Sequence, residues 1–178
     1  MIAVDGGEVW AEDSEGGGPP VVLLHPGVGD SRIWEPVLPA LTAAYRVIRY
    51  DARGYGRSPA PTVKFSLLAD LITVLGWYGV ERAAMVGCSQ GGGCALGLAI
   101  EEPTRVTALA LLCPGIPGYP WPEEPAELET EYQRALDTRD VDAVADVMQR
   151  VWASCGPTAA VMEPVSYTHL TLPTTPYV

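Results

Sequence analysis

The chain has 178 residues, of which 48% are hydrophobic and 19% charged, and its formal net charge at pH 7 is −11. Binding to nucleic acid or to an anionic membrane surface depends on clustered Lys and Arg, so we predict no nucleic-acid partner and no membrane partner. No apolar run has the length of a membrane-spanning helix, and the first residues lack the basic and apolar regions of a signal peptide. A cytoplasmic location is therefore expected.

Strand and helix patterns alternate along the chain as far as residue 112. Residues 8–12 have the alternating pattern of an early antiparallel strand. Four further strands are predicted at residues 21–24, 46–50, 83–86 and 106–112. Two segments between them carry an apolar stripe at helical spacing, formed by Trp34, Val37, Leu38 and Leu41 and by Leu68, Leu71, Ile72 and Leu75. This order predicts an α/β fold with a doubly wound, mostly parallel sheet that binds ligands at the carboxyl ends of its strands.

Residues 87–91 have the pattern G-x-S-x-G and lie between the predicted strand 83–86 and a helix of small residues. A serine on a sharp strand-to-helix turn can attack a carbonyl carbon, and we expect Gly87 and Gly91 to give the backbone the freedom for this turn. Ser89 is therefore a candidate nucleophile. The N–H of Gln90, at the start of the helix, would point at the developing oxyanion.

The same glycines also fit the phosphate-binding loop of a dinucleotide-binding unit, which likewise follows a strand and opens a helix. Such a unit places an acidic residue at the end of the next strand. Residues 106–112 run instead into Cys113-Pro114-Gly115, with no acid. The nucleophile interpretation is therefore favoured.

Glycine-rich loops follow two of the predicted strands, one beginning at His25 and the other at Asp51. Together with the segment around Ser89, they resemble the α/β-hydrolase superfamily in order and spacing over residues 20–112. The residues that carry the resemblance are His25 and Gly27, then Asp51, Arg53, Gly54, Gly56 and Ser58, then the turn around Ser89, and finally Pro103, Arg105 and Val106.

The resemblance implies that Ser89 is the catalytic residue of a nucleophile elbow and that the backbone of Gln90 supplies one donor of the oxyanion hole. The second donor is implied in the first glycine-rich loop, at Gly27 or Val28. Pro26, where the family usually has glycine, has no N–H and leaves both of these residues as candidates. No cofactor and no metal is implied.

His25, Asp51 and Arg53 are implied to be structural loop residues rather than catalytic ones. In the family, the catalytic acid and then the catalytic histidine follow the serine, and further strands and helices precede that histidine. The only histidine after Ser89 is His169, which comes too early. We therefore expect this chain to be truncated, to lack its C-terminal catalytic acid and histidine, and to be inactive as it stands.

A proline-rich linker follows residue 115, and two helical segments after it indicate the start of a helical cap. Their apolar stripes are Leu128, Tyr132, Ala135 and Leu136 and, after a capping Asp140, Val144, Val147, Met148, Val151 and Trp152. Tyr119 and Trp121 face either substrate or the core, and packing against the core is favoured.

We predict three parts of the chain: an α/β-hydrolase core at residues 1–115, a partial helical cap at 116–164 and a non-native tail at 165–178. Residues 165–174 resemble the in-frame translation of a transposase library adapter, which would make His169 foreign to the natural protein. The alternative is a genuine polar tail rich in Thr and Pro.

The four cysteines, Cys88, Cys94, Cys113 and Cys155, show neither a C-x-x-C pair nor metal-ligand spacing. We expect them to be buried, unpaired thiols.

The predicted function is that of a serine-dependent hydrolase, which cleaves an ester, a lactone or a similar acyl bond in a small-molecule substrate. The same residues also fit an acyltransferase or a cofactor-free peroxidase, because a fold does not fix the reaction. A non-catalytic ligand receptor on the same scaffold is a further alternative. The intact serine and its glycines favour an enzyme.

Overall fold

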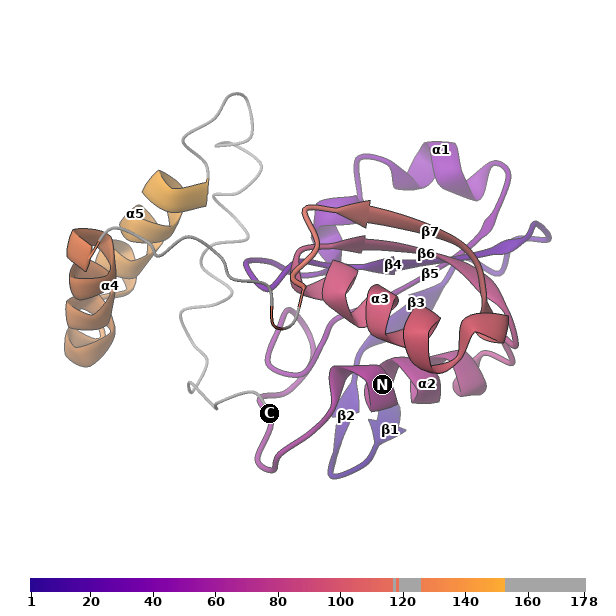
Figure 1. Ribbon diagram of the computed structural model, residues 1–178, viewed down its shortest axis with the longest axis horizontal. Helices are drawn as coiled ribbons and strands as arrows, with labels where there is room; N and C mark the ends of the chain where they lie inside the picture. Colours follow the sequence, from indigo (N-terminus) through magenta and orange to yellow (C-terminus); the bar gives the residue numbers. More distant parts are fainter. Residues whose placement is uncertain (117, 119–125, 153–178) are drawn as a thin grey trace.

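In the computed structural model, residues 1–116, 118 and 126–152 are described, and they form a layered α/β part and a pair of helices (Figure 1). The main sheet has five strands in the order β3-β5-β4-β6-β7. These are β3 (Ala11–Asp13), β4 (Pro20–Leu24), β5 (Arg46–Tyr50), β6 (Ala83–Cys88) and β7 (Val106–Leu112). β3 pairs antiparallel with β5, and the other pairs are parallel. The predicted mostly parallel sheet is confirmed.

The single strand predicted at residues 8–12 is wrong, because the chain changes partner at Trp10. β2 (Gly7–Val9) pairs antiparallel with β1 (Ile2–Val4) in a separate two-stranded sheet. β3 then begins at Ala11 and joins the main sheet beside β5. The sequence pattern gives no sign of this change, since a residue in either sheet satisfies the same preference for extended backbone.

One face of the main sheet is covered by α2 (Leu67–Trp77) and α3 (Gln90–Glu101), which pack against each other (Figure 1). Ser66 caps α2, because its hydroxyl accepts the N–H of Ala69 at 3.3 Å. The predicted apolar stripe of α2 faces the sheet, and its leucines at positions 71 and 75 are fully buried in the larger core.

The other face is covered by η1 (Ser31–Trp34) and α1 (Leu38–Thr42), not by the single helix predicted from the stripe at residues 34–41. Pro36 has no N–H, so it cannot donate the hydrogen bond that would continue a helix from η1. The tryptophan that ends η1 is buried against β4 and β5. Val37, which belongs to the predicted stripe, is 44% exposed.

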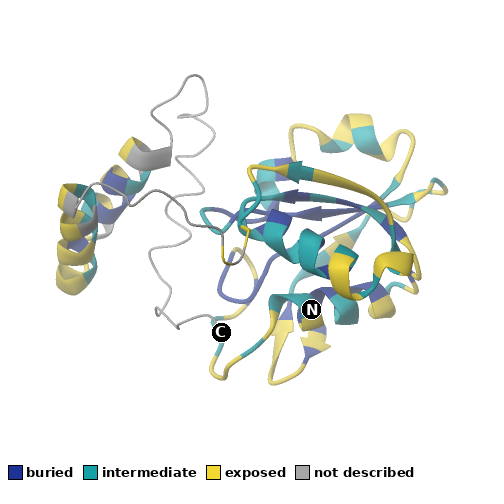
Figure 2. Ribbon diagram, viewed as in Figure 1, coloured by how far each residue is buried: buried dark blue, intermediate teal, exposed yellow. Residues whose placement is uncertain are grey.

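α4 (Ala126–Thr138) and α5 (Val141–Trp152) pack against each other and match the two helical segments predicted after the linker. Asp140 caps α5, since its Oδ1 accepts the N–H of Ala143 at 3.0 Å. Both helices bury part of their apolar stripes (Figure 2), including Ala135, Val144 and Val147. The boundaries proposed for the cap and the tail remain predictions.

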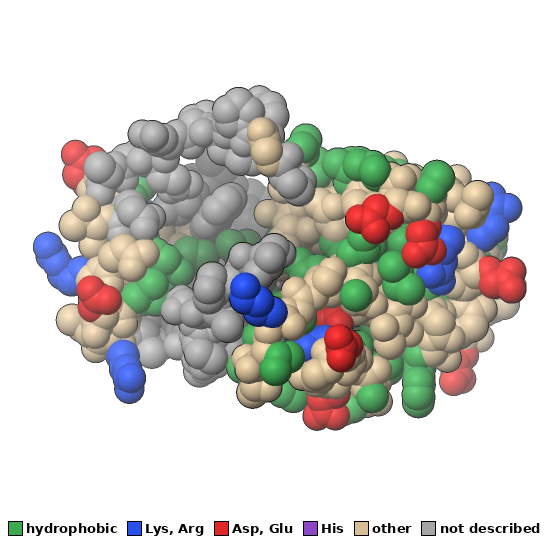
Figure 3. Space-filling view, turned by 60° about the horizontal axis from the view of Figure 1, so that its bottom comes forward, with side chains coloured by type: hydrophobic (Ala, Val, Ile, Leu, Met, Phe, Trp, Pro, Cys, Tyr) green, Lys and Arg blue, Asp and Glu red, His purple; other side chains and the backbone are tan. Residues whose placement is uncertain are grey.

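The surface of the described residues mixes charges of both signs. On the face shown in Figure 3, Lys and Arg side chains are scattered among Asp and Glu rather than gathered in one area. Within the described ranges, every helix is too short or too polar to cross a bilayer.

Candidate active site

Ser89 lies between the end of β6 and the first residue of α3, on the sharp turn predicted for it. Its φ of 49° and ψ of −114° lie outside the regions that L-residues prefer. The backbone holds this conformation: the Ser89 N–H donates to the carbonyl of Leu112 at 2.9 Å. The Ser89 carbonyl accepts from Gly93 at 3.0 Å and from Gly115 at 2.8 Å. These hydrogen bonds connect the turn to the end of β7 and to the segment after it. Ser89 itself is only partly buried.

The two glycines of the elbow are required by close packing and not, as expected, by backbone freedom at the turn. Neither Gly87 nor Gly91 has a positive φ, and the left-handed residue is Ser89 itself. A Cβ on Gly87 would lie 2.7 Å from the Cα of Gly92, and a Cβ on Gly91 would lie 2.6 Å from the carbonyl oxygen of His25. Both positions must therefore lack a side chain so that α3 can approach β6 and the end of β4.

Replacing Gly91 with Ala is expected to destabilise the protein by about 1–3 kcal/mol, because the added methyl overlaps backbone at the end of β4. Gly76→Ala is the matched control: Gly76 lies in α2, and nothing stands within 4 Å of an added Cβ. That change should stabilise the protein by about 0.5–1 kcal/mol. Urea unfolding curves measure both shifts, and a Gly91→Ala chain as stable as its parent would contradict the close approach.

The glycine-rich loop that begins at His25 and contains Gly27 to Gly29 is called the glycine loop below, and it lies beside the first turn of α3. A Cβ on Gly27 would lie 3.5 Å from the side chain of Gln90, so the two residues are in contact. As the first residue of α3, Gln90 has an N–H without an acceptor in the helix. Among the described residues, the N–H groups of Gly27 and Val28 have no backbone acceptor, whereas Gly29 donates to the carbonyl of Pro26 at 3.2 Å. Gly27 therefore lies beside Gln90, the residue after Ser89, and Gly27 and Val28 both remain candidates for the second donor.

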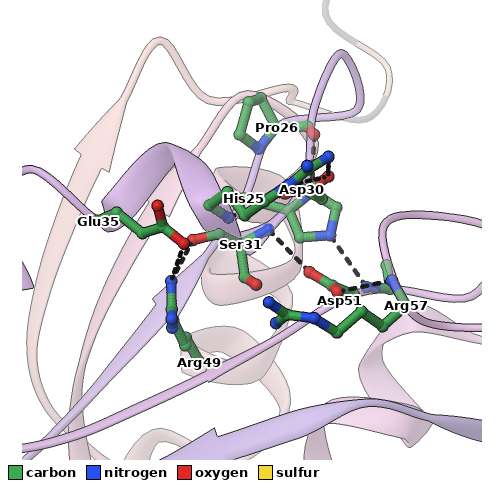
Figure 4. A network of polar contacts seen from close by, with 10 residues as sticks. His25, Pro26, Asp30, Ser31, Glu35, Arg49, Asp51 and Arg57 are labelled. Atoms are coloured by element: carbon green, nitrogen blue, oxygen red, sulfur yellow. Dashed lines mark hydrogen bonds and ion pairs between the residues drawn. The ribbon is translucent and has the colours of Figure 1, made fainter. Parts of the chain in front are cut away.

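His25 is buried at the end of β4, and both nitrogens of its ring are bonded to backbone (Figure 4). Nε2 lies 2.9 Å from the nitrogen of Ala52, which can only donate, so Nε2 is the acceptor. Nδ1 then carries the proton and donates to the carbonyl of Pro26 at 2.8 Å. Burial lowers the pKa of His25 and favours the neutral ring. With Nε2 already occupied, His25 has no lone pair left to take a proton from Ser89.

Mild acid is expected to destabilise the fold through His25. Its pKa in the folded protein is lower than the value of about 6.5 in an unfolded chain, so the unfolded chain takes up the proton first as pH falls. The stability that the neutral ring contributes is therefore complete above about pH 6.5 and is lost as pH falls toward the folded-state pKa. Urea unfolding at about pH 7.5 and about pH 5.5 measures the loss. His25→Gln should show a smaller loss over this interval, and an equal loss would assign it to other groups.

Asp51 joins the loop after β5 to the segment after β4. Its carboxylate accepts the N–H of Ser31 at 2.8 Å and the N–H of Arg57 at 2.9 Å (Figure 4). Its carbonyl accepts the hydroxyl of Ser58 at 2.6 Å. Gly56 has a φ of 51°, and a Cβ there would overlap the Asp51 carboxylate. These contacts fix the shape of the loop and place the carboxylate among backbone donors.

Arg53 joins the same loop to α2 and to the β1–β2 turn. Its guanidinium donates to both carboxylate oxygens of Asp70, at 2.8 Å and 2.7 Å, and to the carbonyl of Asp5 at 2.6 Å. The Arg53 and Asp70 side chains are each only 2% exposed. The Arg53 guanidinium also lies 4.9 Å from the centre of the Phe65 ring. Arg53 is thus the centre of a buried contact between three segments.

Two buried acids near the site were not predicted. Asp30 caps η1 and pairs with the Arg32 guanidinium at 2.6 Å. Burial alone would raise the pKa of Asp30, but the hydrogen bonds from Arg32 hold it below its ordinary value. An Asp directly before a helical turn is a common N-cap, which was the available signal. For Asp70, nothing in the sequence pattern identifies Arg53 as the partner.

The cysteines differ from the expectation of buried thiols. Cys113 is exposed, and Cys88 and Cys94 are partly buried, although all three are unpaired as predicted. Cys155 lies outside the described residues, as do Tyr119, Trp121, His169 and the predicted tail at 165–178.

A small cavity of about 10 Å³ lies between the end of β4 and the first turn of α3, with His25, Tyr50, Gln90 and Cys94 among its lining residues. Its volume is enough for about one water molecule. Larger hollows of about 470 and 440 Å³ lie along α4 and include none of the predicted site residues. No cluster of three or more metal-ligating side chains is found in the part of the chain that the structure describes.

Comparison with known proteins matches the chain to one family and to relatives within it. The family model described as alpha/beta hydrolase fold matches residues 19–153. RutD of Caulobacter segnis, named as a carbamate hydrolase, is 34% identical over 125 residues, which are 67% of this chain and 43% of that protein. The pimeloyl acyl-carrier protein methyl ester esterase of Legionella pneumophila is 39% identical over 100 residues, which are 54% of this chain and 38% of that esterase. The chain therefore spans less than half the length of these relatives.

Solved structures of the same architecture include the esterase RhEst1 from Rhodococcus sp., with a TM-score of 0.74 and 26% identity, over 96% of this chain and 67% of that one. The esterase EaEST from Exiguobacterium antarcticum has a TM-score of 0.78 at 24% identity, over 96% of this chain and 67% of that one, and shows the fold alone. The order of the strands, the elbow at Ser89 and the family match all agree. The chain belongs to the α/β-hydrolase fold family.

Proposed function

We propose that this chain carries the nucleophile and the oxyanion hole of a serine hydrolase that cleaves an ester or a similar acyl bond. The observation that carries the proposal is the strained turn at Ser89, with φ at 49° and the glycine loop in contact with the next residue. Strain at a partly exposed polar residue is typical of functional sites. The names of the relatives, a carbamate hydrolase and a methyl ester esterase, support cleavage of an acyl bond.

In the proposed reaction, the Ser89 oxygen attacks the carbonyl carbon of the substrate and the carbonyl π electrons move onto oxygen. The oxyanion accepts hydrogen bonds from the N–H of Gln90 and from the N–H of Gly27 or Val28. The positive end of the α3 dipole favours the same charge. Collapse of the intermediate expels the alcohol or amine, and water then releases the acyl group from Ser89.

His25, Asp51 and Arg53 have a positioning role in this proposal. His25 bonds to the carbonyl of Pro26 inside the glycine loop, and Asp51 bonds to Ser31 just after it. Arg53 anchors the neighbouring loop to α2. Together they hold the oxyanion donors in place without touching the reacting atoms.

The proton acceptor for Ser89 is proposed to lie beyond the described residues, with the acid that orients it. The described residues include a single histidine, His25, and its lone pair is occupied. A serine without a base is a weak nucleophile. We therefore expect the described residues alone to lack turnover at the rate of a complete triad.

The substrate is proposed to be a small acyl compound. One relative is named for an ester carried on an acyl-carrier protein, so a carrier-bound acyl group is the alternative substrate. Hydrolysis of short-chain esters by the enzyme, compared with hydrolysis of the same acyl group on a carrier protein, separates the two.

Labelling with a fluorophosphonate probe tests the proposed nucleophile. An enzyme that carries this site together with its proposed base should be labelled at Ser89, because the probe reacts with a serine that has been activated by a base. Ser89→Ala should abolish the label, and Ser66→Ala, which alters only the cap of α2, should keep it. Labelling of Ser89→Ala equal to that of the parent would overturn the assignment.

A further inference from the structure

His25 connects the glycine loop to the loop after β5 through a hydrogen bond whose direction is fixed. The Ala52 N–H can only donate, and Nε2 of His25 accepts it at 2.9 Å. Within the described part of the chain, this N–H has no second acceptor. Ala52 and His25 are only 6% and 4% exposed, so water has little access to either partner while the two loops stay together.

The glycine loop is held near both of its ends by the loop after β5 (Figure 4). At its start, His25 accepts from Ala52 and donates to the carbonyl of Pro26 at 2.8 Å. Just beyond its end, the N–H of Ser31 donates to the carboxylate of Asp51 at 2.8 Å. The first of these two connections depends on an imidazole, a side chain that gains a proton in mild acid.

A proton on Nε2 of His25 removes the acceptor of the first connection. The ring then presents an N–H to the N–H of Ala52, whereas a hydrogen bond needs one donor and one acceptor. If the loops stay together, the buried Ala52 N–H is left unpaired, which costs free energy comparable to a lost hydrogen bond. If the loops separate, water hydrates both groups. Protonation therefore favours the separated state.

The groups around the ring determine how readily it takes up a proton. They are two carboxylates, two phenol rings and a thiol: Asp30, Asp51, Tyr50, Tyr55 and Cys94. The carboxylates favour a charged ring, but Asp30 is paired with Arg32 and burial outweighs both acids, so the pKa of His25 is lowered. Burial raises the pKa of Tyr50 and of Cys94, so neither is charged in mild acid. The buried ring therefore stays neutral at pH values where a ring in water is already charged.

We propose that His25 is a pH-sensitive switch for the glycine loop: protonation of Nε2 separates the ring from the Ala52 N–H and opens the loop while the sheet stays folded. This inference rests on the proposed function, because the loop carries Gly27 and Val28, the candidates for the second oxyanion donor. Acid thus disables the proposed site without unfolding the protein. A return to neutral pH restores the contact and closes the loop.

Amide hydrogen exchange of the chain of 178 residues tests the switch without relying on hydrolysis. In the open state the ring titrates at about pH 6.5, so a change from about pH 7.5 to about pH 5.5 should raise the open population about tenfold. The protection factors of Ala52 and of Gly29, whose N–H donates to the carbonyl of Pro26, should fall by that ratio. Urea below the unfolding transition should leave these two protection factors unchanged while it lowers those of the β6 amides.

His25→Gln is the matched variant, because an amide accepts a hydrogen bond and does not titrate. The protection factor of Ala52 in this variant should be the same at both pH values, whereas Cys94→Ala, which alters another residue of the same cavity, should keep the tenfold fall. Exchange of the unsubstituted chain remains decisive if a variant fails to fold. The proposal is overturned if Ala52 and Gly29 are equally protected at both pH values, if they respond to urea as β6 does, or if His25→Gln keeps the fall. A missing fluorophosphonate label at Ser89 would count against the proposed function instead.

Discussion

Ser89→Ala is expected to lower kcat for ester hydrolysis by about six orders of magnitude in an enzyme that carries the proposed site and a complete triad. In the proposed reaction, the hydroxyl oxygen makes the bond of the acyl intermediate, so its removal leaves only the proposed oxyanion hole and substrate binding. Alanine keeps the Cβ and the same backbone preference, so stability should change little. Initial rates with a p-nitrophenyl ester, together with a urea unfolding curve, measure both quantities.

Ser66→Ala is the control for this prediction. Ser66 caps α2, and its loss should cost about 1 kcal/mol of stability while kcat stays unchanged. A Ser89→Ala enzyme that keeps more than about a thousandth of the parent kcat would assign the nucleophile to another residue.

Asp70→Ala is expected to destabilise the fold by about 3–5 kcal/mol, the largest stability effect predicted for this chain. The guanidinium of Arg53 would stay buried without its carboxylate, because both side chains are only 2% exposed. Urea unfolding of the variant measures the loss. Arg53 also holds the loop after β5 to α2, so hydrogen exchange of that loop should accelerate in the same variant.

Glu131→Ala is the matched control for the buried ion pair. Glu131 pairs with Arg150 at 2.6 Å, but their side chains are 49% and 44% exposed. The loss of this exposed pair should cost far less stability than the loss of the buried one, because solvent screens it. Replacing both buried partners, in Arg53→Met with Asp70→Leu, should recover much of the stability that Asp70→Ala loses. Equal losses in Asp70→Ala and Glu131→Ala would show that burial does not set the cost.

The parallel strands could be predicted closely from the sequence. The predicted strands at 46–50 and 106–112 have the observed boundaries of β5 and β7. The apolar and β-branched residues run up to Asp51 in the first and up to Cys113-Pro114-Gly115 in the second. The position of the Ser89 turn beside the glycine loop followed from the rule that the carboxyl ends of parallel strands lie at the same edge of the sheet. The α/β-hydrolase fold is confirmed by the family match.

Features that depend on long-range contacts could not be predicted. The close approach that requires Gly91 to lack a side chain involves the carbonyl of His25, a residue far away in the sequence. The burial of Asp70 depends on an arginine from another loop. The error at residues 34–41 was local: the apolar spacing was helical, but Pro36 interrupts the hydrogen bonding that a helix needs.

The contact of Gly91 with the carbonyl groups that end β4 determines how the site meets a ligand. Because this contact leaves no gap, α3 and the glycine loop cannot slide past each other without separating. In the proposed reaction, an incoming acyl group therefore meets donors that are already oriented, which lowers the entropy cost of ordering the loop. In the proposed reaction, the close packing of α3 against the end of β4 thus lowers the barrier by holding the Gln90 N–H in place.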